Sequence, residues 1–133
     1  MTTPPAAWQV RAELATRLAD AEAAGVPRWG LIADPGIGFA KTAEHNLALL
    51  RELRTFGRGA DGLGVPLLVG LSRKSFIGAL LGGVPPKERV WGTAAACAAC
   101  FPHADLQRVH DVREIKQVVT VLDAIHRPQS QHT

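Results

Sequence analysis

The sequence lacks tyrosine and contains few other aromatic residues, with four phenylalanines and three tryptophans in 133 residues. A core built mainly from large rings is therefore excluded, and the interior must rest on alanine, leucine, valine and isoleucine. Those residues are plentiful, because apolar residues make up 47% of the chain. This share argues against wholesale disorder, and the length suits a single domain.

Other absences exclude further classes of protein. The net charge is only +3, and no block of Lys and Arg is interleaved with aromatics, so we expect no nucleic-acid partner. No apolar run reaches the length of about 18 residues that a membrane-spanning helix requires, so we expect no membrane partner. The N-terminus has no charged segment followed by an apolar one, so no signal peptide is visible.

Cysteine is also scarce, and the two that exist, Cys97 and Cys100, lie in an alanine-rich stretch. A metal-binding or redox CxxC pair is one interpretation, but a second pair or a histidine at zinc spacing is missing. We favour the other interpretation, in which both are small core residues of a buried helix. Free thiols in a core suit a reducing compartment.

Apolar spacing and turn residues divide the chain into alternating helices and strands. The predicted helices span about residues 8–24, 42–53, 75–81, 87–100 and 112–125, with Thr42 as an N-cap. The predicted strands span residues 29–33, 65–70 and 106–110, and the first two are apolar enough to be buried on both faces. The alternation predicts an α/β fold with parallel strands and helices outside them.

Polar residues follow each predicted strand. They are Asp34 after the first, the run Ser72-Arg73-Lys74 after the second, and Arg108 with His110 at the end of the third. In parallel α/β folds the carboxyl ends of the strands form one edge, where ligands bind. We therefore expect one carboxylate, one lysine and an arginine–histidine couple to share a site.

Each of these residues has a plain structural alternative. The Asp34 carboxylate could accept two parallel hydrogen bonds from an amidine-like ring edge, or it could simply stabilise a turn. Lys74 could bind a ring carbonyl and Ser75, at a helix start, a carboxylate, or the segment could be a solvated basic turn. Arg108 has the fork that suits phosphate oxygens, but it could instead pair with Asp111 or Glu114.

His110 would add a second hydrogen-bond donor beside Arg108, because residues two apart on a strand point to one face.

Four segments resemble those of dihydropteroate synthases, and they occur in the order found in that family. They are IADPGIGF at 32–39, LVGLSRKSFIG at 68–78, WGTAAA at 91–96 and RVHDV at 108–112. The resemblance implies a (β/α)8 TIM barrel, of which this chain would hold about three C-terminal βα units. It places the pterin-binding domain at residues 10–126, between a loose N-terminal segment at 1–9 and a loose tail at 127–133.

The same resemblance implies a role for each site residue. Asp34 and Lys74 would act in catalysis and, with Gly38, hold the pterin. Phe39 and Ser75 would form the p-aminobenzoate site.

Pyrophosphate would be bound by Arg108, Val109 and His110. No metal ligand is expected in this chain, and the Mg²⁺ of the family would be held by the missing N-terminal half.

The implied activity is a transferase reaction of folate biosynthesis. It condenses 6-hydroxymethyl-7,8-dihydropterin diphosphate with p-aminobenzoate to give 7,8-dihydropteroate and pyrophosphate. The complete enzyme would be a homodimer in the cytoplasm, or in a mitochondrion if it is part of a eukaryotic multifunctional enzyme. Because nothing matches the earlier strands of the barrel, we expect this chain to be a fragment that is inactive alone.

Two alternatives remain. A pterin-binding methyltransferase domain shares the barrel, but it has no pyrophosphate to bind, and the SRK and RVH segments argue against it. A non-catalytic remnant could instead bind a partner chain through its exposed sheet edge.

Overall fold

The computed structural model describes residues 5–39 and 42–127. The α-helices are α1 (Ala7–Ala23), α2 (Ala43–Arg51), α3 (Ser75–Leu80), α4 (Val90–Cys100) and α5 (Val112–His126). The 3₁₀-helices are η1 (Arg28–Gly30), η2 (Leu53–Phe56) and η3 (Pro86–Glu88). The strands are β1 (Leu68–Val69) and β2 (Leu106–Gln107).

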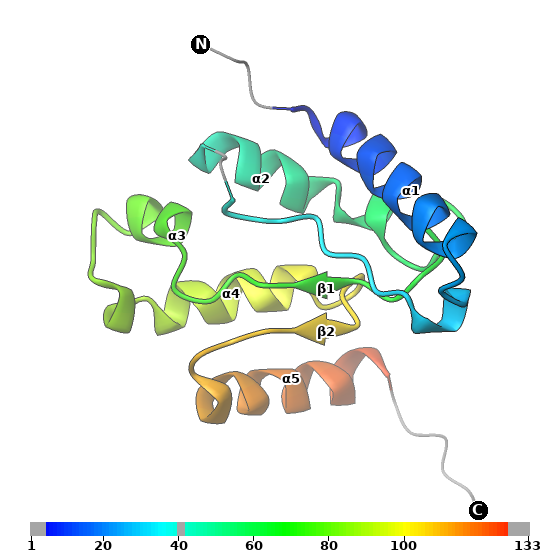
Figure 1. Cartoon of the computed structure of the whole chain (residues 1–133). Helices are drawn as coiled ribbons and strands as arrows, with labels where there is room; N and C mark the ends of the chain where they lie inside the picture. The colour runs from blue at the N-terminus through cyan, green and yellow to red at the C-terminus, as the bar shows by residue number, and fades with distance from the viewer. Residues whose placement is uncertain (1–4, 40–41, 128–133) are drawn as a thin grey trace, which may run out of the picture.

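Three parallel segments form the middle layer. β1 pairs with β2 in the register Leu68 to Leu106, and Ala33 forms a parallel bridge to Leu67 on the other side of β1. In Figure 1 all three segments run in the same direction, with α1 and α2 drawn on one side of them and α5 on the other. The predicted α/β fold with parallel strands, a part of a barrel, is confirmed.

The first predicted strand is wrong in most of its length. Arg28–Gly30 form a 3₁₀-helix, and only Ala33 pairs with a neighbour. Trp29 is 89% exposed and Ile32 is 53% exposed, so this segment is not buried on both faces. Among the described residues only the β1 segment lies beside it, where Ala33 bridges to Leu67. Apolar composition indicates where a strand can be buried, but burial of both faces needs other segments packed against each of them.

The other two predicted strands are shorter than expected. Within 65–70 only Leu68–Val69 is a strand, although Val65, Leu67 and Val69 are buried as predicted. β2 ends at Gln107, so Arg108 and His110 lie beyond the strand and not within it.

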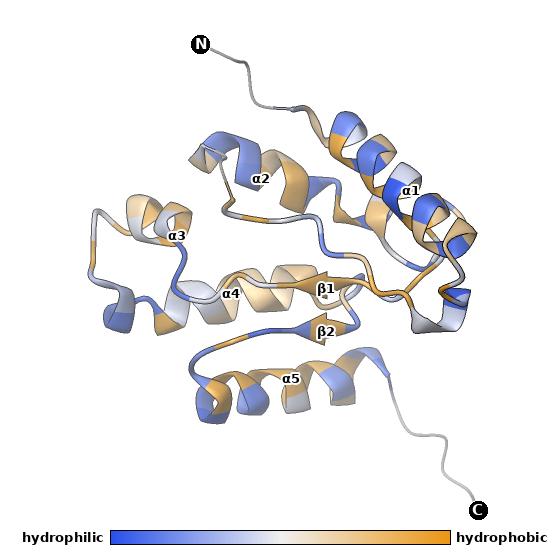
Figure 2. Ribbon diagram, viewed as in Figure 1, coloured by the Kyte–Doolittle hydropathy of each residue, from blue (hydrophilic) through white to orange (hydrophobic). Residues whose placement is uncertain are grey.

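The core is aliphatic, as the lack of aromatics predicts. Figure 2 shows hydrophobic residues along β1 and the segment that leads to it, whereas α1 and α5 alternate between hydrophobic and hydrophilic residues. All three tryptophans lie outside the core, with exposed fractions of 69% (Trp8), 89% (Trp29) and 79% (Trp91). Three phenylalanines are buried, of which Phe56 is fully buried and Phe76 and Phe101 are 3% and 4% exposed.

Helix boundaries follow local chemistry in most places. The Oγ1 of Thr42 accepts a hydrogen bond from the backbone N–H of His45 at 3.3 Å, so the predicted N-cap is confirmed. The predicted helix at 87–100 is divided into η3 and α4. Pro85 and Pro86 lie at the start of η3, and Arg89 separates η3 from α4. None of the helices among the described residues is long and apolar enough to cross a lipid bilayer.

The chain ends differ somewhat from the predicted loose segments. α1 begins at Ala7, so residues 7–9 are helical and not loose. Residues 1–4 and 128–133, which make up most of the predicted loose ends, lie outside the described residues.

The interpretation of Cys97 and Cys100 as core residues is confirmed. Both are free thiols on α4 with 1% exposure. Burial raises the pKa of Cys97 to about 11, and burial together with the neighbouring thiol raises the pKa of Cys100 to about 12. Both sulfurs therefore stay protonated at neutral pH.

Candidate functional site

The turn Ser72-Arg73-Lys74 joins all three strand ends. It follows β1, the middle segment, and its consecutive side chains reach in two directions. Ser72 and Arg73 bond to residues that follow β2, whereas Lys74 bonds to the loop that follows Ala33. This turn therefore links Lys74 to the loop after Asp34 and links His110 to the end of β1.

Lys74 reaches the loop that begins at Asp34. Its Nζ donates a hydrogen bond to the carbonyl oxygen of Ile37 and lies 4.7 Å from the centroid of the Phe39 ring, in a cation–π contact. The hydrocarbon part of the side chain crosses the backbone of Gly38. Two residues of the predicted pterin site, Gly38 and Lys74, are thus in direct contact.

The buried side-chain amide of Asn46 holds the loop around Gly38. The backbone N–H of Gly38 donates to Oδ1 of Asn46 at 2.7 Å, and Asn46 lies on α2 with 1% exposure. The side chain of Asn46 occupies an apolar face, since Leu49 and Leu53 on the same side are also buried. Asn46 could have been predicted as a functional or structural polar residue, because it stands at a position of the helix where apolar residues are expected.

Asp34 stabilises a turn, as its alternative interpretation suggests. Its Oδ1 accepts a hydrogen bond from the backbone N–H of Gly36 at 2.9 Å. The residue is exposed, and it borders a pocket of about 370 Å³ between this loop and α1. The turn bond orients the carboxylate toward solvent-accessible space, and the pterin role of Asp34 stays a prediction.

Ser72 orients the imidazole of His110. The backbone N–H of His110 donates to Ser72 Oγ at 3.0 Å, and Nδ1 of the ring lies 2.9 Å from the same oxygen. Ser72 is 5% exposed, and its hydroxyl hydrogen is satisfied when it points at Nδ1. In that arrangement the neutral ring carries its proton on Nε2, which can donate to a ligand.

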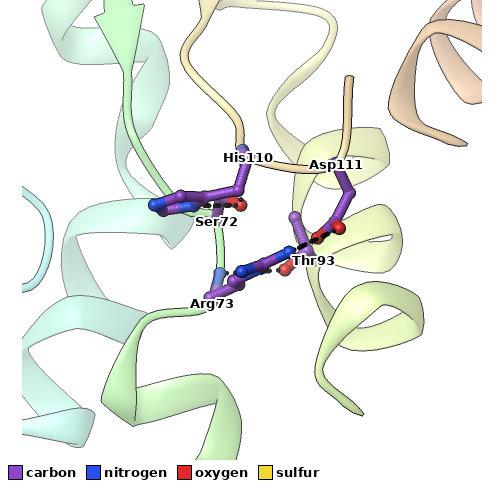
Figure 3. Close-up of polar contacts among 5 residues, drawn as sticks. All are labelled: Ser72, Arg73, Thr93, His110 and Asp111. Carbon is purple, nitrogen blue, oxygen red and sulfur yellow. Dashed lines mark hydrogen bonds and ion pairs between the residues drawn. The ribbon is translucent and has the colours of Figure 1, made fainter. Parts of the chain in front are cut away.

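Arg73 pairs with Asp111 in a bidentate contact that Figure 3 shows beside the Ser72–His110 pair. Arg73 Nε and Nη2 donate to the two carboxylate oxygens at 3.2 and 2.8 Å. This hydrogen bond holds the pKa of Asp111 below its usual value, and it raises the pKa of Arg73. The ion pair considered for Arg108 is therefore made by Arg73.

The guanidinium of Arg108 lies beside Gly70, the residue that follows β1. A Cβ atom on Gly70 would stand 2.9 Å from Arg108 Nη2, and among the described residues the guanidinium makes no ion pair. Arg108 lies against Gly70 and His110 against Ser72, so both sit on the β1 side of their segment. The side chain of Val109 instead lines a pocket against α5, so only its backbone is left for the predicted pyrophosphate contact.

The two residues predicted for p-aminobenzoate flank Lys74. Ser75 is the exposed first residue of α3, directly after Lys74, and Phe39 is 62% exposed on the other side of the Lys74 amine. Their positions suit one shared subsite, and their roles stay predictions.

Sequence patterns did not predict the hydrogen bonds and the ion pair that support the site. Thr93, whose Oγ1 accepts from the backbone N–H of Arg73 at 3.1 Å, belongs to the WGTAAA segment, to which no physical role was assigned. Ser72 was expected at the site only as part of the strand-end run, and Asp111 only as a possible partner of Arg108. Their contacts with His110 and Arg73 were not predicted.

The charges at this edge suit an anionic ligand. Lys74, Arg108 and His110 are hydrogen-bond donors with positive or titratable heads, and Asp34 is the one carboxylate predicted to bind substrate. Among the described residues no three His, Cys, Asp or Glu side chains gather closely enough to hold a metal ion.

Comparison with known proteins gives consistent matches. The family of pterin binding enzymes matches residues 2–110. The sequence is 57% identical over 98 residues to the dihydropteroate synthase of Synechocystis sp., in a match that covers 73% of this chain and 32% of that protein.

Solved structures are similar over nearly the whole chain. Xanthomonas albilineans dihydropteroate synthase with 4-aminobenzoic acid matches with a TM-score of 0.86 and 37% identity, over 97% of this chain and 48% of that one. The enzyme from the same organism in complex with 7,8-dihydropteroate matches with a TM-score of 0.83 and 40% identity, over 91% and 46%. This chain thus spans about a third of the Synechocystis protein and about half of the Xanthomonas chains.

Proposed function

Because the chain belongs to the family of pterin binding enzymes, we propose that it supplies the last βα units of a dihydropteroate synthase. In that role it would hold the pterin and its diphosphate and one side of the p-aminobenzoate site. The single observation that carries the proposal is the turn Ser72-Arg73-Lys74, which contacts the neighbouring strand end on each side. The turn supplies Lys74 and hydrogen-bonds His110, and Arg108 lies against Gly70 just before it, so an anionic substrate could bind among these three residues.

The proposed reaction is a substitution at the pterin methylene carbon. The bond from this carbon to the diphosphate oxygen breaks, and the oxygen leaves with the bonding pair. The aryl amine nitrogen of p-aminobenzoate forms the new bond to carbon and gives up a proton.

The residues of this chain would serve two steps of that reaction. Arg108 and the Nε2 proton of His110 would stabilise the charge on the departing diphosphate. Asp34 and Lys74 would orient the pterin ring, which lowers the entropy cost of aligning the two reactants. Gly38 supports this task by leaving room for the Lys74 side chain.

We further propose, on the family resemblance, that the protein ligands of magnesium lie outside this chain. A homodimer and a cytoplasmic location, or a mitochondrial one, are likewise proposed for the complete enzyme on the family resemblance. Since the chain spans about half of the matched structures, turnover by this chain alone is not expected.

The direct test is isothermal titration of the chain with 6-hydroxymethyl-7,8-dihydropterin diphosphate and with inorganic pyrophosphate. We expect both to bind, and Arg108→Ala to weaken both by about tenfold or more through loss of a charged hydrogen bond. Arg113→Ala, on the exposed side of α5, is the matched control and should change neither affinity. Absence of binding, with self-association instead, would favour a non-catalytic remnant.

A further inference from the structure

Arg73 has an unusual backbone conformation for its residue type. Its φ is +59°, in the left-handed region, and within the described residues every other positive φ belongs to glycine. An L-residue with a Cβ atom adopts this region at a cost in free energy. Such a conformation persists where the surroundings determine it, and it is found most often at functional sites.

The surroundings of Arg73 hold it from several directions. Its backbone N–H donates to Thr93 Oγ1 at 3.1 Å, and its carbonyl oxygen accepts from Arg89 Nη1 at 2.7 Å. Its guanidinium forms the bidentate pair with Asp111. The donor, the acceptor and the side chain are therefore all engaged, so the left-handed conformation is imposed by contacts from α4 and from the start of α5.

This conformation separates the two neighbouring side chains. Ser72, before Arg73, hydrogen-bonds His110, and Lys74, after it, turns the other way to reach Ile37. In an extended chain, successive side chains point to opposite faces, so Ser72 and Lys74 would point to the same face. The change of direction at Arg73 is what allows three consecutive residues to serve two different strand ends.

We infer that Arg73 is a positioning residue, whose ion pair with Asp111 holds Lys74 and His110 in the geometry that binds the pterin diphosphate. This inference rests on the proposed function. In this inference the guanidinium does not bind substrate, because both of its hydrogen-bonding nitrogens are directed at Asp111 (Figure 3).

The competing possibility is that Arg73 binds the diphosphate directly. The two possibilities predict opposite effects for Asp111→Asn. If Arg73 binds the anion, weakening its partner frees the guanidinium, and the affinity for pyrophosphate rises or stays constant. If Arg73 positions other residues, the same change weakens the affinity.

The test is titration of the full chain and its variants with inorganic pyrophosphate. We expect Asp111→Asn and Arg73→Gln each to weaken binding by about tenfold, and the double variant to lose no more than either single one, because both remove the same contact. Arg54→Gln removes an exposed ion pair with Asp61 at 3.8 Å and is the control, with no expected change. Unchanged or tighter binding by Asp111→Asn would overturn the inference.

A second variant separates the ion pair from the backbone conformation. Arg73→Gly accepts the left-handed angle without strain and removes only the ion pair, so its affinity should match that of Arg73→Gln. Wild-type affinity in Arg73→Gly would show that the side chain positions nothing, and would overturn the inference.

A readout without ligand distinguishes this inference from the proposed function. Amide hydrogen exchange of His110, whose N–H donates to Ser72, should speed up at least about tenfold in Arg73→Gln and stay unchanged in Arg54→Gln. If the wild-type chain fails to bind pyrophosphate but this exchange changes as expected, the proposed function fails and the positioning by Arg73 stands. Equal exchange in all three proteins would refute the positioning.

Discussion

The side chain of Lys74 lies so closely across Gly38 that a Cβ atom on Gly38 would stand 2.6 Å from Lys74 Cδ. Real Cβ atoms do not approach other carbons so closely, so any residue other than glycine at this position must displace the lysine. The two residues come from the ends of different parallel segments. Their contact therefore links the loop after Asp34 to the turn after β1.

Gly38→Ala should separate site geometry from general stability. Both Gly38, with φ of +88°, and Gly83, with φ of +90°, adopt left-handed angles, but a Cβ on Gly83 would meet nothing within 4 Å. Each alanine variant should lose about 1–2 kcal/mol of unfolding free energy, measured in urea. Only Gly38→Ala should also weaken binding of the pterin diphosphate. Equal affinities of the two variants would contradict a role of the Gly38–Lys74 contact in binding.

Lys74→Ala should impair the chemistry in a complete version of the enzyme. We expect turnover to fall at least about tenfold, which corresponds to roughly 1.4 kcal/mol of transition-state stabilisation. Lys87→Ala, in the exposed helix η3, removes the same charge and should leave turnover unchanged. The measurement is the steady-state turnover of both variants. Full turnover by Lys74→Ala would show that Lys74 does not contribute to catalysis.

Ser72→Ala should weaken pyrophosphate binding through His110. Without the hydroxyl, the imidazole loses the partner that sets its proton on Nε2, and the backbone N–H of His110 loses its acceptor. We expect about a tenfold loss of affinity by titration, in line with an unsatisfied polar group. Thr16→Ala, which removes an exposed hydroxyl on α1, is the control.

Stability should fall in acid partly because of Asp111. Arg73 lowers the pKa of the folded carboxyl below its unfolded value of about 3.9, so the ionised form is bound more favourably in the folded state. This contribution is present above about pH 4 and is lost as pH falls through the folded pKa. The unfolding free energies of wild type and Asp111→Asn should therefore differ at neutral pH, and the difference should shrink as pH falls through the folded pKa of Asp111.

The control for that experiment is Asp61→Asn, which removes an exposed carboxylate 3.8 Å from Arg54 and changes the net charge equally. A gap between wild type and Asp111→Asn that stays constant down to pH 2 would contradict the role of the Arg73 pair.

The two buried thiols should shape the alkaline limit of stability. Their pKa values of about 11 and about 12 in the folded chain exceed the unfolded value, so above about pH 9 the unfolded chain releases protons that the folded chain retains. The unfolding free energy should therefore decrease as pH rises from about 9, and less so in a Cys97→Ala/Cys100→Ala variant. A thiol reagent at about pH 8 should label these cysteines only after unfolding.

Local patterns were sufficient to predict much of the fold. The alternation of apolar segments with turn residues predicted parallel segments and the order of helices, and Thr42 marked the start of α2. Because carboxyl ends of parallel strands meet at one edge, the sequence also predicted that Lys74, Arg108 and His110 would gather there. These inferences depend on rules that act within a few residues or on connection order, so they can be made without coordinates.

The strand lengths and the pairing of polar groups were decided only in three dimensions. Ile32 is exposed although its segment is apolar, because burial depends on which segments pack against it, a fact that no local pattern contains. Likewise Asp111 pairs with Arg73, 38 positions away, and not with Arg108, three positions away. Which charged groups meet depends on where separate segments are packed and how each backbone turns. The sequence therefore determined which residues could form the site, and the packing of the three strand ends determined which of them support the others.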